Sequence, residues 1–434
     1  MCSPNSEHRP LPVMPGRVAR HTSQFWGVDL LCWCRMPAPK GQKVWPKGGS
    51  KSWLLDPRIV QLNHGSFGAT PRSVLDEQDR WRRLMEANPT GFVLETFEPA
   101  LDEARARLSA LVGAEPSDLV FITNATMGVN AVVRSLPFQP GDELLTINHV
   151  YNACRNALEY AATRSGAKVV IADVPFPLDS PDVVVDSLLS AVTERTRFVL
   201  IDHVTSPTGL VLPIEDIVTP LEARGVTVMV DGAHGPGMVP LDLDRLGASY
   251  YAGNCHKWLC SPKGSAFLWA RSGLGERLVP PVISHGWNDP RTDRPRFHLL
   301  FDYMGADDSS PHLAVPAAID FLSSLYPGGL AGTMDHNRSL ALAARDLLCD
   351  FLAIEHPAPD SMIGSLAAVP LPDSNEEMTG QFDPLGLRLL HDHRIQVPVF
   401  AWPRWPQHCL RISAAPYNNL DQYQVLIAAL EAEL

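Results

Sequence analysis

Two residues on neighbouring apolar segments could together perform carbonyl chemistry. Asp231 follows a mainly apolar run, 226–230, that is typical of a buried strand. Lys257 lies in a second short apolar segment, between His256 and Trp258. A lysine held away from water can lose its proton and form a Schiff base with an aldehyde. A carboxylate facing a pyridinium nitrogen is the other protein group that pyridoxal phosphate requires, so the pair predicts an enzyme that uses this cofactor.

The elements that must position these residues alternate regularly along the chain. Apolar runs typical of buried strands occur at 118–123, 143–147, 168–172, 197–202 and 226–230, with a last one at 266–270. Helical periodicity occurs between them, at 153–165, 183–191 and 214–223. This order predicts an α/β fold whose mainly parallel sheet is covered by helices on both faces. Such sheets bind ligands at the carboxyl ends of their strands, where Asp231 lies.

The segment 124–130 follows the first of these strands and begins another helix. A strand, a polar turn and a helix N-terminus in this order leave free backbone N–H groups at the turn, and the helix dipole favours an anion there. A phosphate site is one interpretation. Any strand-turn-helix unit offers the same groups, so a purely structural turn is the alternative.

Composition disfavours several classes of protein. The formal net charge of −12 argues against nucleic acid or an anionic membrane as the main partner. The eight cysteines are scattered, so they predict neither a disulfide framework nor, at Cys32 and Cys34, a metal site. We find no apolar run long enough to span a bilayer and no signal peptide, so a cytoplasmic enzyme without a metal is expected.

The length of 434 residues suggests more than one domain. Residues 1–50 show no helical or strand period and are expected to form an irregular N-terminal extension. Residues 51–315 are expected to form a large domain, with 51–112 partly in the small domain, and 316–434 a smaller α+β domain. The irregular stretch 275–312 is long for a loop inside a compact protein, which predicts a functional role.

From about residue 53 to its end, the chain resembles the class V aminotransferase family of fold type I pyridoxal phosphate enzymes, in its isopenicillin N epimerase-like branch. The motifs that carry the resemblance are LNHGSFG at 62–68, NAT at 124–126, VDGAH at 230–234, GNCHKW at 253–258 and LRISA at 410–414. The resemblance implies a large domain with a seven-stranded-type sheet between helices, a smaller C-terminal domain, and pyridoxal 5'-phosphate as cofactor. These motifs are specific for the superfamily but not for one reaction.

The resemblance also implies roles around the cofactor ring. Lys257 would form the Schiff base and carry the proton at the substrate Cα, and Asp231 would keep the pyridine nitrogen protonated. His234 and Ser206 would flank the 3'-oxygen of the ring, although a loop histidine with only structural bonds is the alternative for His234. Tyr151 is expected to stack on the ring, with His149 as its competitor.

The phosphate would be held by Thr126 and the backbone of Met127, joined by Asn254 and His256. Arg411 would bind the substrate carboxylate, because paired guanidinium and carboxylate groups suit an amino-acid substrate. Asn63 and His64 would lie near the substrate.

A homodimer is implied too, because the loop around Trp287 and Gly305 would reach the phosphate of the partner subunit. Related proteins often place a threonine after this glycine, and here the residue is Ala306, which puts that one contact in doubt. The segment 397–407 lacks the cysteine that a cysteine desulfurase needs, and Cys409 lies at the start of a strand. Persulfide chemistry is therefore disfavoured.

Three reactions remain open. Epimerisation, which the resemblance favours, needs a second acid on the opposite face of the substrate, such as Tyr151 or His64. A C–S lyase of the cysteine desulfhydrase kind needs a leaving group at Cβ, and an aminotransferase needs Lys257 to move the proton to the cofactor. A scaffold without catalysis is the alternative from another class, and the joint presence of Lys257, Asp231, Thr126 and Arg411 argues against it.

Overall fold

The computed structural model describes residues 51–378, 380 and 382–434, all within one compact unit. The extension predicted for residues 1–50 lies outside the described residues.

A seven-stranded sheet forms the centre of this unit, in the order β2-β8-β7-β6-β5-β3-β4. Its strands are β2 (Leu119–Ile122), β3 (Glu143–Ile147), β4 (Lys168–Ala172), β5 (Thr196–Asp202), β6 (Thr227–Gly232), β7 (Tyr250–Asn254) and β8 (Ala266–Ala270). β8 is antiparallel to both neighbours, and the other pairs are parallel. The predicted mainly parallel sheet is confirmed, with its last strand inserted between β7 and β2.

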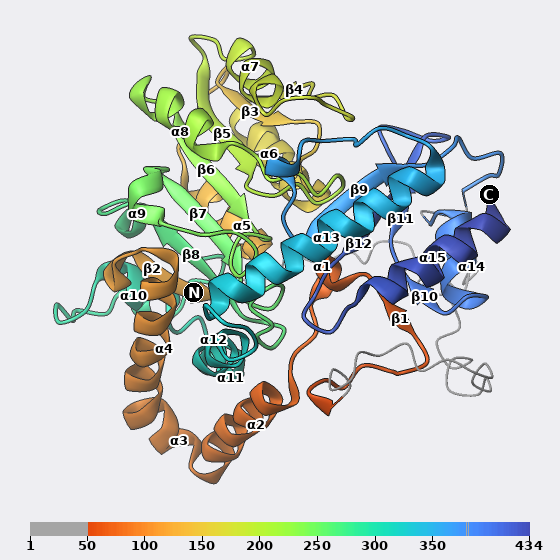
Figure 1. Ribbon diagram of the computed structural model, residues 1–434. Helices are drawn as coiled ribbons and strands as arrows, with labels where there is room; N and C mark the ends of the chain where they lie inside the picture. Colours follow the sequence, from red (N-terminus) through yellow and green to blue (C-terminus); the bar gives the residue numbers. More distant parts are fainter. Residues whose placement is uncertain (1–50, 379, 381) are drawn as a thin grey trace, which may run out of the picture. The chain divides into compact units, whose positions relative to one another are not determined.

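Helices cover both faces of the sheet (Figure 1). They include α5 (Ala125–Ser135) and α6 (Asn152–Ser165) on one face, and α7 (Asp182–Ser190) and α8 (Ile214–Ala223) on the other. Successive strand residues point to opposite faces. Leu200 and Met229 therefore pack in the core beside α5 and α6, whereas Val199 and Val228 pack in the other core. Both faces are apolar, which explains why the strands read as nearly continuous apolar runs.

The C-terminal part contains a three-stranded antiparallel sheet in the order β11-β12-β9. Its elements are α13 (Leu330–Leu352), β9 (Leu366–Pro370), α14 (Pro384–His391), β10 (Ile395–Gln396), β11 (Val399–Ala401), β12 (His408–Ser413) and α15 (Leu420–Glu433). The N-terminal strand β1 (Val60–Gln61) pairs with β10 in parallel. The domain boundaries at 315 and 316 stay a prediction.

Two segments connect these parts. The first holds α1 (His64–Phe67), α2 (Arg72–Ala87), α3 (Pro89–Gly91), the π-helix η3 (Phe92–Thr96) and α4 (Phe97–Val112). The second, expected to be irregular, contains α10 (Arg296–Phe301), then α11 (Ser310–Leu313), and is followed by α12 (Val315–Ser323). None of the described helices combines the length and apolar character that crossing a bilayer requires.

Candidate active site

The carboxyl ends of β5 and β6 bring two acidic side chains to one face of the sheet. Asp202 and Asp231 are paired across these adjacent parallel strands, and both are buried. Asp231 accepts a hydrogen bond from the backbone N–H of Ala233 at 3.0 Å and one from the thiol of Cys154 at 3.0 Å. Burial and the neighbouring charge of Asp231 raise the pKa of Asp202 well above its ordinary value. Asp202 is therefore expected to be neutral.

Lys257 follows β7 and is partly exposed, with its Nζ 3.0 Å from Nε2 of His234. Loss of water around the ammonium lowers the pKa of Lys257 to about 8, while the negative charge of Asp231 acts in the opposite direction. A substantial fraction of this amine is thus neutral near pH 8. A neutral amine is the form that attacks a carbonyl carbon.

His64 lies behind Lys257 and contacts its backbone. His64 Nε2 is 2.9 Å from the Lys257 carbonyl oxygen, and Nδ1 is 3.0 Å from the hydroxyl of Tyr417. Because a carbonyl only accepts, Nε2 carries the proton and Nδ1 accepts from Tyr417. Burial lowers the pKa of His64 to about 4. Both ring nitrogens are thus engaged by the protein, which favours a role in holding Lys257 in place over a role as a second acid.

The N-terminus of α5 forms the turn predicted to bind phosphate. The structure brings Thr126, Met127 and Asn254 together there, since Asn254 Oδ1 accepts from the backbone N–H of Ala125 at 2.8 Å. The Met127 N–H points to the side chain of Asn124, at 2.9 Å, and not into the turn. A phosphate bound by Met127 would therefore have to displace Asn124.

His256 lies partly exposed between Asn254 and Lys257. Its Nδ1 is 3.1 Å from the Ser265 carbonyl oxygen, so this nitrogen carries the proton. Desolvation lowers the pKa of His256 to about 4. Among the described residues, no hydrogen-bond partner is found for Nε2, which leaves that nitrogen for a ligand.

Arg411 is buried in the middle of β12, with 3% of its surface exposed. Its guanidinium donates to the carbonyl oxygen of Ser206 and, at 3.2 and 3.4 Å, to Ser66 Oγ and Asn63 Oδ1. The ring of Phe400 lies 5.5 Å from its Cζ. Within the described part of the chain no carboxylate forms an ion pair with Arg411, and its Nε has no partner. A buried cation without a counter-ion is costly, which is typical of a site for an anionic ligand.

Tyr151 and His149, the two candidates for ring stacking, differ in their surroundings. Tyr151 precedes α6 and is 45% exposed. His149 is fully buried, with its nitrogens 2.7 Å from the hydroxyl of Thr208 and 2.9 Å from the carbonyl of Val174. Burial raises the pKa of Tyr151, while the positive charge of Arg411 opposes this shift. Among the described residues no hydrogen-bond partner is found for the Tyr151 hydroxyl group, whose raised pKa keeps it protonated at neutral pH. The stacking role of Tyr151 stays a prediction.

Several residues of the site had no predicted role. Ser66 and Trp258 belong to the motifs at 62–68 and 253–258 but were given no function, and Asp202 ends a predicted strand beside Asp231. Cys154 lies one helical turn after Tyr151, so helical spacing could have placed it on the same face. Nothing in the sequence around Tyr417 indicates that it belongs to the site, because its contact with His64 joins residues far apart in the chain. Ser206 contacts Arg411 through its carbonyl oxygen and its hydroxyl group, and its predicted place beside the 3'-oxygen of the ring stays a prediction.

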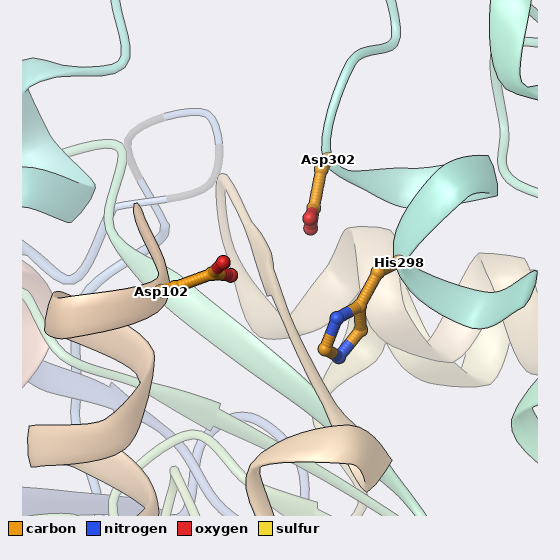
Figure 2. A group of neighbouring side chains, drawn as sticks. All are labelled: Asp102, His298 and Asp302. Atoms are coloured by element: carbon orange, nitrogen blue, oxygen red, sulfur yellow. The ribbon is translucent and has the colours of Figure 1, made fainter. Parts of the chain in front are cut away.

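A second group of charged side chains, only partly buried, resembles a metal site. Asp102 of α4, His298 of α10 and Asp302 point toward one another, each with a potential ligand atom within 4.8 Å of the others (Figure 2). Arg105 donates to Asp102 and Asp302, both at 2.7 Å, and contacts His298 Nδ1 at 2.9 Å. Arg294 donates to Asp102 at 2.8 Å and to Asp302 at 3.1 Å. The arginines thus occupy the atoms that a metal would need, so this group joins α4 to the loop that follows α10.

Comparison with known proteins gives a consistent result. Residues 68–298 match the family model described as Aminotransferase class-V. The chain is 38% identical over 395 residues to an isopenicillin N epimerase of Amycolatopsis lactamdurans, covering 87% of this chain and 96% of that protein. It is 29% identical over 360 residues to a putative L-cysteine desulfhydrase of Oryza sativa subsp. japonica, covering 79% and 73%.

Among solved structures, a cysteine desulfurase of Escherichia coli has a TM-score of 0.70 and is 23% identical, covering 89% of this chain and 97% of that one. At this identity the likeness concerns the fold alone.

Proposed function

The chain belongs to the class V aminotransferase family, and we propose that it is a pyridoxal phosphate-dependent enzyme acting at the Cα of an amino acid or amino-acid-containing small molecule. Its reaction would be most like that of the isopenicillin N epimerases. The observation that carries this proposal is the buried guanidinium of Arg411, which has no counter-ion among the described residues and whose charge acts on Lys257. An amino-acid carboxylate supplies the missing negative charge and places its Cα near the lysine.

The residues present fit the cofactor. Lys257 would offer an amine of lowered pKa to its aldehyde, and Asp231 would offer a buried carboxylate to its ring nitrogen. The N-terminus of α5 would hold its phosphate, with Asn124 displaced from the Met127 N–H. When bound, the cofactor supplies an electron-withdrawing ring that stabilises negative charge at the substrate Cα. Neutral Asp202 beside Asp231 would keep the total negative charge at this end of the sheet low.

Two side chains would move the proton during epimerisation. The neutral amine of Lys257 removes it from Cα, while Arg411 fixes the carboxylate so that only one face is offered to the amine. The hydroxyl of Tyr151 returns a proton to the opposite face, since its raised pKa keeps it protonated at neutral pH. His64 supports Lys257 through the backbone and would not itself transfer a proton.

A C–S lyase is the second candidate, and the similarity to a putative cysteine desulfhydrase favours it. That reaction needs Lys257 and Arg411 but not Tyr151. Persulfide formation is disfavoured further, because Cys409 is buried in β12 and burial raises its pKa to about 12. Transamination is the third possibility within the same site.

Two experiments test the proposal. Borohydride reduction of the protein with bound cofactor should fix pyridoxal phosphate on Lys257, as located by peptide mass spectrometry, and Lys257→Ala should abolish both the adduct and turnover. A panel of L- and D-amino acids in D₂O should then show exchange at Cα and a change of chirality. Release of sulfide or pyruvate would replace the epimerase with a lyase, and a keto acid without chiral change would indicate an aminotransferase. Absence of any adduct would overturn the cofactor assignment.

We further propose a homodimer. A cavity of about 380 Å³ lies beside Met127 and is lined by Phe97, Phe121, Phe301, Tyr303 and Gly305. Large apolar side chains are exposed in this part of the chain, namely Leu94 (76%), Ile283 (58%), Trp287 (51%) and Val282 (50%). A second subunit would remove this surface from water. Light scattering should give twice the chain mass, and Leu94→Asp should weaken the dimer and with it cofactor affinity.

A further inference from the structure

A chain of three side chains leads from the protein interior to the amine of Lys257. The indole Nε1 of Trp258 lies 3.1 Å from Nδ1 of His234, and the Nε2 of His234 lies 3.0 Å from Nζ of Lys257. Trp258 and His234 are buried, with 3% and 2% of their surfaces exposed. Water therefore competes little for the contact between Trp258 and His234.

The chemistry of the three groups fixes the direction of both hydrogen bonds. An indole N–H only donates, so Nδ1 of His234 must accept and cannot carry a proton. Neutral His234 then carries its single proton on Nε2, facing Lys257. This N–H can bond only to a nitrogen that still has its lone pair, which means the neutral amine. An ammonium at this position would instead direct its own proton against the N–H of the histidine.

Packing fixes the indole that begins the chain. Trp258 packs in a small apolar cluster with Val204, Met238 and Leu366. Gly237 allows the loop that carries His234 to lie against the backbone of Trp258. A Cβ at this position would be 2.6 Å from the Trp258 carbonyl group, and its φ of +82° favours glycine. The indole N–H is thus held in one direction by residues that take no part in the chemistry.

We propose that Trp258 is a positioning residue that sets the tautomer of His234 and thereby holds Lys257 as a neutral amine ready to attack the cofactor aldehyde. The proposal rests on the proposed function and deepens it. In that step the nitrogen lone pair forms the new bond to carbon, and a C=N bond results with release of one water molecule. The hydrogen bonds from Trp258 to His234 and from His234 to Lys257 favour the neutral amine, which has this lone pair available.

Other charged and titratable groups also act on the Lys257 amine. Desolvation and the charge of Arg411 disfavour its protonated form, and the charge of Asp231 favours it. Asp202 and Cys154 would favour the protonated form only if they were ionised, and the pKa of each is raised well above its ordinary value. His256 is adjacent in sequence, and His64 contacts the backbone of Lys257. Trp258→Phe changes none of these groups. Any effect of that variant on the Lys257 amine must therefore be transmitted by His234 or by altered packing, and the experiment must distinguish these two routes.

The test is the pH dependence of cofactor incorporation into the full-length, cofactor-free protein. The rate is followed by borohydride trapping and quantified as the Lys257 adduct, so turnover is not needed. In Trp258→Phe, His234 can accept a proton on Nε2 from an ammonium. The pH midpoint should therefore rise by about one unit, which slows incorporation at pH 7 about tenfold.

The matched background is His234→Gln, whose amide donates an N–H to Lys257 without any tautomer. Trp258→Phe should shift the midpoint in the wild-type background but not in His234→Gln. A shift of equal size in both backgrounds would show that Trp258 acts through packing alone and would overturn the proposal, as would no shift in either. If the wild type forms the adduct but Trp258→Phe does not shift the pH midpoint, only the role of Trp258 is overturned and the proposed function stands. If the wild type forms no adduct, the proposed function itself is overturned.

A second measurement applies if Trp258→Phe does not fold. Nitrogen-15 spectra of histidine-labelled wild type, with the His234 signals identified by their loss in His234→Gln, report the tautomer directly. A proton on Nε2 and none on Nδ1 is expected in the cofactor-free protein. The opposite tautomer would overturn the proposal.

Discussion

Two buried arginines in this protein have opposite surroundings. Arg105, with 1% of its side chain exposed, donates to the carboxylates of Asp102 and Asp302 and contacts a histidine. Arg411 is also buried, but its polar partners among the described residues are a carbonyl, two hydroxyls and an amide, all of them neutral. One positive charge is neutralised within the fold, and the other is not.

The difference separates a structural role from a binding role. Removing one partner of a buried ion pair is strongly destabilising, so the group around Arg105 holds α4 and the loop after α10 together. A buried charge without a counter-ion is costly in the free protein, and an anionic ligand would remove that cost. The same contrast makes the Asp102, His298 and Asp302 group a poor metal site, and it supports the proposal that Arg411 binds a carboxylate.

The largest effect is expected for Arg411→Met. Loss of a buried, hydrogen-bonded charge contact costs 2–5 kcal/mol, so kcat/KM for carboxylate substrates should fall roughly 30- to 4,000-fold. The free energy of unfolding should stay the same or rise, because a charge without a counter-ion is removed. Arg411→Lys is the matched control and should lose less activity, since it keeps the charge but not the planar pair of donors. Unchanged kinetics in the Met variant would remove the substrate-carboxylate assignment.

The reverse pattern is expected for Asp302→Asn. This carboxylate is 8% exposed and bonds to both arginines of its group, so the variant should lower the free energy of unfolding by about 3–5 kcal/mol. The chemical step on Lys257 should survive at temperatures where the variant is folded. Asp102→Asn is the control, with a smaller loss expected because that side chain is 45% exposed. Urea unfolding measures both, and equal losses of stability for Asp302→Asn and Arg411→Met would erase the contrast.

A third effect concerns Lys257, whose charge makes the stability of the protein depend on pH. The pKa of Lys257 is lowered to about 8, against about 10.4 for a free lysine. Between these values the unfolded chain binds more protons than the folded one, so stability should rise as pH increases through this window. Below it the cost of the buried charge is fully present. In cofactor-free protein, Lys257→Met should flatten this rise and be more stable than the wild type at pH 7, as measured by urea unfolding at pH 7 and 9.5.

The smallest effect is expected at an exposed ion pair. Arg245 and Glu215 are 2.8 Å apart, but their side chains are 70% and 62% exposed. Glu215→Gln should change the free energy of unfolding by less than about 1 kcal/mol, and 1 M salt should abolish the difference. A loss as large as that of Asp302→Asn would mean that burial does not decide the strength of these pairs.

Local pattern was sufficient for most elements of the large sheet. The strand at 143–147 and the helix at 214–223 have the predicted bounds, because apolar periodicity and short connecting loops act within a few residues. The position of β8 could not be read in this way, since strand order depends on which edges meet after the chain has folded. The turn at the start of α5 was predicted, but the bond from Met127 to Asn124 was not.

The sequence by itself determined the family and the mainly parallel sheet, and it predicted cofactor chemistry at Lys257 and Asp231. Only the tertiary structure decided which polar groups surround them. It placed Tyr417 on His64, Trp258 on His234 and Ser66 on Arg411, and it left Arg411 without a carboxylate among the described residues. The physical reason is that residue type and spacing fix local conformation, whereas the neutralisation of a buried charge depends on segments that meet only when the chain is folded.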